Sequence, residues 1–230
     1  GDFSCFSFHG QKNISTLGEG GMIYVKNNLL ASKVLGLRHN GHTNFKFNRK
    51  QYWLPAMGNL DRDIKNVWPY KFTLSEIQSG AGIVMLKKLD KLNNIRINRA
   101  KKFIEKLSNF SEIMLVEPKK KSQHVYHLLS AYYQPSRNIN RDNLIDILYK
   151  KYSIKCATQY YPLYKYDLFK KMGYGKASCP MTEKFYFNMI SFPFHVWMTN
   201  KEFNYLIDSV IKSLKYLRKS LKNLDEKKNL

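Results

Sequence analysis

The start of the chain alternates apolar and polar side chains, which is the pattern of a β-strand. Residues 3–8 alternate Phe and Cys with Ser, and this period of two predicts a short buried strand. Residues 21–25, Gly-Met-Ile-Tyr-Val, predict a second strand after a loop rich in glycine and polar residues. Asn27 or Asn28 can then cap a helix that runs to about Leu37. Two strands and one helix are too few for a complete domain, so we expect these strands to need further partners.

The strongest helical pattern lies in the middle of the chain. Thr73 or Ser75 can open a helix in which apolar side chains recur at helical spacing as far as residue 107. Its first turns carry the small residues Ser-Gly-Ala-Gly at 79–82, which let another element approach closely. The preceding residues 39–69 hold His, Asn, Gly, aromatic and Pro residues and predict an irregular segment. Such long irregular segments usually carry function or form an interface.

The second half of the chain alternates strand and helix patterns. We expect strands over residues 114–116, 125–133, 154–157 and 189–192. We expect helices over residues 139–152, near whose start lies Asn140 or Asp142, over residues 180–187, and from a Thr199–Glu202 capping box onward. An aromatic loop spans residues 158–180, and a charged tail that frays begins near residue 220. This order of elements predicts an α/β or α+β fold.

The balance of charge bears on the class of partner. The 230 residues carry 39 Lys and Arg against 17 Asp and Glu, a formal net charge of +22. Such a charge is expected of a nucleic-acid binder. Only eight of the cations are Arg, however, and the lysines are scattered along the chain, whereas base and phosphate recognition favours Arg. We therefore attribute the charge first to a composition rich in Lys and Asn, and otherwise to attraction of anionic substrates such as nucleotide-linked sugars.

Cysteine usage and hydropathy exclude several classes. Cys5, Cys156 and Cys179 lie far apart and form no CxxC motif, which argues against a zinc site or a disulfide framework. His39 and His42 have no third ligand at metal spacing, so we expect no metal. No apolar run is long enough to span a membrane, and the first residues lack the features of a signal peptide. These features indicate a protein of the reducing cytoplasm without a membrane partner.

The segment richest in chemistry runs from Ser7 to Gly21, with the sequence Ser-Phe-His-Gly-Gln-Lys-Asn-Ile-Ser-Thr-Leu-Gly-Glu-Gly-Gly. Its lysine, Lys12, lies in a loop just past a predicted strand. A lysine amine can attack a carbonyl group when desolvation or a nearby cation favours its neutral form. The Ser7 hydroxyl, five residues earlier, could bind an anion. Spacing alone leaves two interpretations open: a Schiff-base lysine, or one of thirty-one solvated lysines, which spacing by itself favours.

This segment resembles the cofactor-lysine segment of the DegT/DnrJ/EryC1/StrS family, whose members are pyridoxal-phosphate sugar aminotransferases. The resemblance continues in order along nearly the whole chain, at residues 70–83, 89–99, 126–128, 159–163, 179–183 and 191–199. It implies the type I aminotransferase fold, an α/β fold. Residues 1–75 would form the C-terminal part of the large domain that binds pyridoxal phosphate, residues 76–108 a long linking helix, and residues 109–230 a small C-terminal α/β domain.

The resemblance also implies roles for four residues around the cofactor. Lys12 would form the Schiff base with pyridoxal 5'-phosphate and would carry the proton during transamination. Ser7 would bind the cofactor phosphate. Lys71 and Thr73 would come from the partner subunit and close the phosphate site across a homodimer. Lys71 stands where the family often has Asn, and a lysine can still pair with phosphate as a point charge.

The implied substrates are a nucleotide-linked keto sugar and, as amino donor, glutamate. The product would be an amino sugar for a cell-surface polysaccharide such as lipopolysaccharide. Tyr160 and Tyr161 would lie near the substrate, because the family places the corresponding loop there. Residues 39–73 are the expected dimer contact, since aromatic residues suit the core of an interface. These aromatic residues are Phe45, Phe47, Tyr52, Trp53 and Trp68.

In the family, the cofactor domain begins well before the lysine. Its earlier part supplies most of the sheet, the aromatic ring that stacks on the cofactor and the Asp that pairs with the pyridine nitrogen. This chain matches only from the lysine strand onward, so we expect it to transaminate as part of a longer protein. The alternatives are an inactive fragment or pseudoenzyme of the same fold, or a basic nucleic-acid-binding module. The sequence contains no recognisable motif for reading nucleic acid that would support the nucleic-acid-binding alternative.

Overall fold

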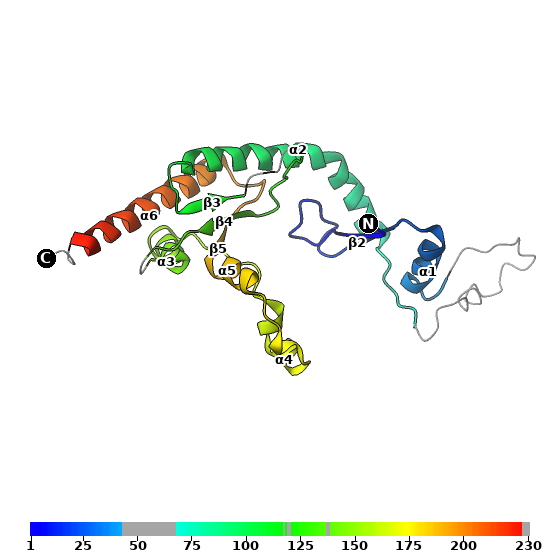
Figure 1. Ribbon diagram of the computed structural model, residues 1–230. Helices are drawn as coiled ribbons and strands as arrows, with labels where there is room; N and C mark the ends of the chain where they lie inside the picture. Colours follow the sequence, from blue (N-terminus) through cyan, green and yellow to red (C-terminus); the bar gives the residue numbers. More distant parts are fainter. Residues whose placement is uncertain (43–67, 117, 119–120, 137–138, 227–230) are drawn as a thin grey trace, which may run out of the picture. The chain divides into compact units, whose positions relative to one another are not determined.

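The structure, a computed structural model, describes residues 1–42, 68–116, 118, 121–136 and 139–226 (Figure 1). The chain divides into two compact units, which are residues 1–90 (unit 1) and residues 91–230 (unit 2). The boundary falls inside the long helix α2 (Glu76–Leu107), so the first part of this helix belongs to unit 1 and the remainder to unit 2. Of the aromatic residues expected at a dimer contact, Phe45, Phe47, Tyr52 and Trp53 lie outside the described residues.

Unit 1 is built on a two-stranded antiparallel sheet. Strands β1 (Phe3–Ser7) and β2 (Gly21–Val25) pair in a register that places Ser7 opposite Gly21. Helix α1 (Asn28–Arg38) follows directly. The Asn27 side chain accepts hydrogen bonds from two backbone N–H groups in its first turn. Both expected strands are confirmed, and Asn27 is the helix cap.

The strand β1 is exposed, so the expectation that it would be buried is wrong for this chain. Phe3 and Phe6 are each 48% exposed, and Ile23 on β2 is 41% exposed. The physical reason is that two strands form no second layer, and the described part of unit 1 does not cover the apolar side chains they present. The exposure agrees with the expectation that these strands need further partners.

A capping box opens α2 at Ser75. The Ser75 hydroxyl accepts from the Gln78 N–H at 3.3 Å, and the Gln78 side-chain oxygen accepts from the Ser75 N–H at 3.2 Å. This exchange satisfies two backbone donors at the helix start. Of the two residues that the sequence offered as an opening, Ser75 and not Thr73 therefore caps this helix, which continues to Leu107 as expected.

Unit 2 contains a three-stranded antiparallel sheet in the order β3-β4-β5 (Figure 1). Its strands are β3 (Ile113–Leu115), β4 (Leu129–Tyr133) and β5 (Met189–Phe192). Its helices are α3 (Arg141–Tyr152), α4 (Asp167–Lys171), α5 (Pro180–Asn188) and α6 (Asn200–Glu226). Except at residues 154–157, the expected strands and helices occur in the order that the sequence predicted. An Asn140 capping box starts α3, and the Thr199–Glu202 box starts α6.

The core of unit 2 lies where α2 and α6 meet the sheet. The Phe103 side chain of α2 is completely buried, and its ring centroid lies 5.1 Å from that of Phe192 on β5 and 6.4 Å from that of Phe203 on α6. On α6, apolar residues at helical spacing are also buried, among them Val210 and Leu214. Amphipathic helices thus cover a sheet whose last strand, β5, is buried along its whole length.

A buried arginine explains why β4 is shorter than expected. The sequence predicted a strand over residues 125–133, but β4 begins at Leu129. The Arg96 guanidinium donates to the carbonyl oxygens of Tyr126 at 3.2 Å and His127 at 3.3 Å. Tyr126 has a left-handed backbone with φ of 47°, which a strand cannot accommodate. The Arg96 side chain, rather than a neighbouring strand, therefore provides the hydrogen bonds to this segment.

Three further expectations need correction. The strand expected at residues 154–157 is an isolated bridge between Ala157 and Ser191. The aromatic loop 158–180 contains short helical segments, among them α4. Helix α6 continues to Glu226, past the expected start of the frayed tail, because Lys, Leu and Glu are strong helix formers.

Candidate active site

The loop that carries Lys12 is closed by its own backbone. The Phe8 N–H donates to the Gly20 carbonyl at 2.8 Å, and the Gly10 N–H donates to the Gly18 carbonyl at 2.6 Å. The Thr16 N–H returns to the Phe8 carbonyl at 3.1 Å. Gly18 has φ of 119°, a conformation that glycine adopts without strain. The β1–β2 connection is therefore a compact hydrogen-bonded loop.

Ser7, His9 and Lys12 lie in one turn at the end of β1. The Lys12 N–H donates to the His9 carbonyl at 2.9 Å, and the His9 N–H donates to the Ser7 hydroxyl at 3.4 Å. The His9 Nδ1 accepts from the Gln11 N–H at 3.3 Å. The Lys12 residue is half-buried, whereas Ser7 is exposed. The structure thus brings together the lysine and the serine that the sequence singled out.

Thr16 anchors this loop between two glycines. It is only 2% exposed, and its hydroxyl donates to the Glu19 carbonyl at 2.9 Å. A Cβ atom on Gly20 would collide with the Thr16 hydroxyl. A Cβ atom on Gly82 of α2 would lie 2.9 Å from the Thr16 methyl group. The expectation that the small residues at 79–82 admit a close approach is confirmed, and the element that approaches is the lysine loop.

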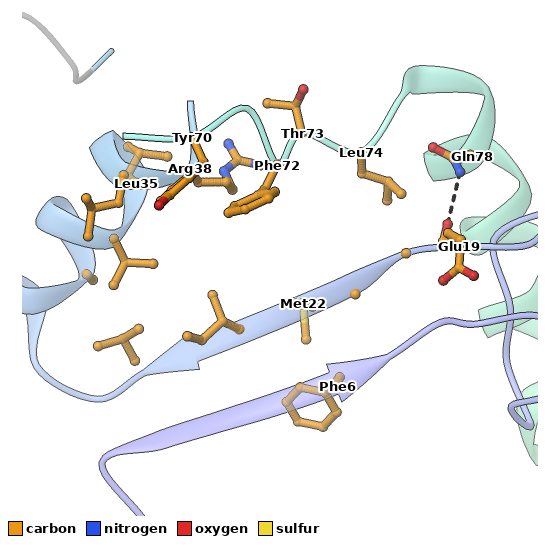
Figure 2. A pocket seen from close by; sticks show the side chains of 17 residues that line it. Phe6, Glu19, Met22, Leu35, Arg38, Tyr70, Phe72, Thr73, Leu74 and Gln78 are labelled. Carbon is orange, nitrogen blue, oxygen red and sulfur yellow. Dashed lines mark hydrogen bonds between the residues drawn. The ribbon is translucent and has the colours of Figure 1, made fainter. Parts of the chain in front are cut away.

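Gln78 fastens the same loop to α2. Its side-chain oxygen takes part in the capping box, and its Nε2 donates to the Glu19 carbonyl at 2.9 Å (Figure 2). One side chain therefore starts the helix and fixes the end of the lysine loop. Sequence reasoning assigned no role to Gln78 or Thr16, although both belong to segments that carried the family resemblance. The signal was available as a polar residue three positions after a cap.

Gly20→Ala tests whether this close packing supports the loop. We expect a loss of about 1–3 kcal/mol in the free energy of unfolding, because the new methyl group must displace the buried Thr16 hydroxyl. Urea denaturation measures it. Gly80→Ala is the matched control, since Gly80 lies in α2 with open space around its Cβ position, and it should stabilise by about 0.5–1 kcal/mol. Equal stability of the Gly20→Ala and unmodified proteins would contradict the proposed packing.

Lys71 lies beside the end of α1. The Tyr70 N–H donates to the Leu37 carbonyl at 2.8 Å, and residue 71 forms an isolated bridge with His39. The Lys71 ammonium lies 3.2 Å from His39 Nδ1. Partial burial, and then the charge of Lys71, lowers the pKa of His39. A neutral imidazole can accept this hydrogen bond, so His39 orients the Lys71 side chain without neutralising its charge.

A cavity of about 1000 Å³ lies beside this segment (Figure 2). Its walls come from β1, the end of the lysine loop, β2, α1 and residues 70–78, and most of the lining side chains are apolar, such as Leu35 and Phe72. Thr73 lines it, but Ser7, Lys12 and Lys71 do not. Within one chain, Ser7 and Lys12 share one turn, whereas Lys71 contacts His39 and Thr73 lines the cavity.

The two tyrosines expected near substrate lie in unit 2. Tyr160 is 70% exposed. The Tyr161 ring is half-buried and meets Tyr166 and Tyr186 edge-on, with centroid separations of 5.0 Å and 5.4 Å. One of the two rings is thus available to a ligand, and the other is held by its neighbours.

The chemistry of the turn fits two ends of pyridoxal phosphate. A lysine amine suits the aldehyde and a serine hydroxyl suits the phosphate, and Lys12 and Ser7 occupy one turn.

Among the described residues, no group of three or more His, Cys, Asp or Glu side chains could hold a metal ion. No helix in the described part of the chain is long and apolar enough to cross a membrane.

Comparison with known proteins places this geometry in a family. The family model for DegT/DnrJ/EryC1/StrS aminotransferases matches residues 1–211. A transaminase from Campylobacter jejuni, named for UDP-4-amino-4,6-dideoxy-N-acetyl-beta-L-altrosamine, is 31% identical over 222 residues, which are 95% of this chain and 54% of the relative. The spore coat polysaccharide biosynthesis protein SpsC of Bacillus subtilis is 24% identical over 91% of this chain and 53% of its own length.

Solved structures show the same fold. The Helicobacter pylori aminotransferase PseC, involved in pseudaminic acid biosynthesis, superposes with a TM-score of 0.77 at 24% identity, over 94% of this chain and 54% of its own. An aminotransferase from Psychrobacter cryohalolentis gives 0.80 at 18% identity, over 95% and 57%. This chain spans about half the length of these relatives. With the type I aminotransferase fold and the lysine loop in place, the chain belongs to the DegT/DnrJ/EryC1/StrS aminotransferase family.

Proposed function

We propose that this chain is the lysine-bearing part of a pyridoxal-phosphate enzyme that transfers an amino group to a nucleotide-linked keto sugar. The amino sugar would enter a cell-surface polysaccharide such as lipopolysaccharide. Glutamate is the proposed amino donor and the cytoplasm the proposed compartment. The observation that carries the proposal is the closed loop in which Lys12 and Ser7 share one turn. The names of the relatives, a sugar nucleotide transaminase and a spore coat polysaccharide protein, support the substrate class.

Each residue of the turn has a defined task in this proposal. Bound pyridoxal phosphate supplies the electron sink for amino-group exchange. Lys12 would hold the cofactor through its aldehyde, and its amine would act as the base that takes up and returns a proton during amino transfer. Ser7 would donate its hydroxyl hydrogen to the cofactor phosphate. Thr16 and Gln78 keep the loop in the shape that presents both groups.

The proposed assembly is a homodimer with shared sites. Lys71 and Thr73 would reach the phosphate that is held by the partner's lysine loop. Support comes from the single-chain arrangement, in which the Lys71 ammonium contacts His39 near the end of α1 and lies outside the Lys12 turn. A lysine held in this way offers a charge-assisted contact to phosphate.

Borohydride labelling tests the proposed role of Lys12. The complete protein that contains this chain is incubated with pyridoxal phosphate, reduced with sodium borohydride and digested. We expect one dominant label, on Lys12 in the peptide that spans residues 7–21, because the proposed phosphate anchor Ser7 lies in the same turn. Solvated lysines should share a weak background label. A dominant label on any other lysine, or an even spread over many, would refute the assignment.

A further inference from the structure

One carboxylate closes the base of the aromatic loop in unit 2. Glu183 on α5 accepts a hydrogen bond from the Tyr164 hydroxyl through Oε1 at 2.6 Å. Its other oxygen, Oε2, lies 2.7 Å from the Lys165 ammonium. The Tyr164 oxygen also accepts from the Cys179 N–H at 3.3 Å. These three contacts join residues 164–165, near the start of the aromatic loop, to residues 179–183 at its end.

The residues that Glu183 holds, Tyr164 and Lys165, follow Tyr160 and Tyr161 closely in the sequence. Pro162, between Tyr161 and the fastened residues, is buried. The Tyr161 ring rests edge-on against Tyr186, three residues after Glu183 on α5. Tyr186 is fixed in turn, because the buried Arg141 donates to its carbonyl at 2.7 Å. The placement of residues 160–161 thus depends on how firmly the following turn is held to α5.

The two charges stay paired over the neutral range. The hydrogen bond from Lys165, and then that from Tyr164, lowers the pKa of Glu183 below its ordinary value. The hydrogen bond to Glu183 raises the pKa of Lys165. The carboxylate contacts are therefore lost only as the pH falls through the lowered pKa of Glu183, and the ammonium contact only as it rises through the raised pKa of Lys165. Both side chains are about a third exposed, so the pair adds little to stability and acts mainly on geometry.

We propose that Glu183 is a positioning residue for the sugar-nucleotide subsite, holding Tyr160 and Tyr161 in place through Tyr164 and Lys165. Tyr160, 70% exposed, would offer its ring face to the ligand, while Tyr161 would fix the direction of the backbone. The inference rests on the proposed function for the nature of the ligand. It goes beyond that function because Glu183 itself need not touch the ligand.

The test compares four variants of the complete protein. Glu183→Ala removes both contacts, Glu183→Gln keeps an acceptor for Tyr164 but loses the charge, and Tyr164→Phe removes only the bridging hydroxyl. Asp146→Asn, which breaks an exposed ion pair with Lys150 on α3, is the matched control. Calorimetry measures the Kd for UDP-N-acetylglucosamine as a probe. Hydrogen exchange reports on residues 160–179, and borohydride labelling reports on Lys12.

We expect Glu183→Ala to raise the Kd about tenfold and to speed exchange in residues 160–179, because a charge-assisted anchor is lost. Glu183→Gln and Tyr164→Phe should show smaller effects in the same direction, and Asp146→Asn none. Lys12 labelling should not change. An unchanged Kd or exchange pattern in Glu183→Ala would overturn the inference, and so would a parallel loss of Lys12 labelling, which would indicate a general structural role. If Lys12 takes no label in the unmodified protein either, a changed Kd in Glu183→Ala would refute amino transfer but leave the positioning role intact.

Discussion

Lys12→Ala is expected to abolish amino transfer while the protein keeps its fold. The loss should be at least about 10³-fold, because the variant has neither the amine that binds the aldehyde nor the group that moves the proton. Stability should change little, since the hydrogen bond that Lys12 makes to His9 uses its backbone N–H, which alanine retains. Transaminase assays and thermal unfolding measure the two effects separately.

Two further variants define the reason for the loss. Lys12→Arg should fail as completely as alanine, because a guanidinium group stays protonated and forms no imine. Lys26→Ala is the matched control, since Lys26 is an exposed lysine just after β2. It should transfer amino groups at the unmodified rate. Activity of Lys12→Ala at the level of this control would show that another residue carries the chemistry.

Phe103→Ala should cause the largest loss of stability, about 3–5 kcal/mol in the free energy of unfolding. The ring is completely buried at the junction of α2, β5 and α6, where it packs against Phe192 and Phe203. Its removal loses apolar burial and leaves a cavity, because three elements meet there and none can shift without disturbing the other two. Urea denaturation of unit 2, followed by tryptophan fluorescence and circular dichroism, gives the value.

Tyr149→Ala provides the comparison for this core variant. Tyr149 is an aromatic residue on α3 with 61% exposure, so its truncation should cost less than about 1 kcal/mol. Phe103→Leu should fall between the two, because it retains most of the apolar volume. A Phe103→Ala protein as stable as Tyr149→Ala would mean that the three elements do not share this core.

The elements of this fold are largely readable from the sequence because their signals are local. Helix α2 is predicted by the spacing of its apolar residues, and α6 by a cap residue that is followed three residues later by glutamate. The order of strands and helices in unit 2 follows in the same way, except for the strand expected at residues 154–157. The turn that holds Ser7 and Lys12 is also local, since the two residues are five positions apart and a short loop keeps them close.

The family resemblance added roles that spacing alone could not give. Lys12 is one of many lysines, and no pattern of charge or hydropathy distinguishes it from the solvated ones. Its neighbours in the motif do so, because Thr16 and Gly20 are now seen to hold the loop shape. These motif residues are therefore required by the packing of the lysine loop.

Contacts between residues far apart in the chain were decided only by the tertiary structure. Gln78 reaches back to Glu19, Arg96 takes the carbonyl oxygens that would have extended β4, and Glu183 ties the aromatic loop to α5. The exposure of β1 belongs to the same class, because an alternating strand looks the same whether or not another layer covers it. Local pattern fixes which face of an element is apolar, while burial and side-chain partnership depend on what the rest of the chain brings to that face.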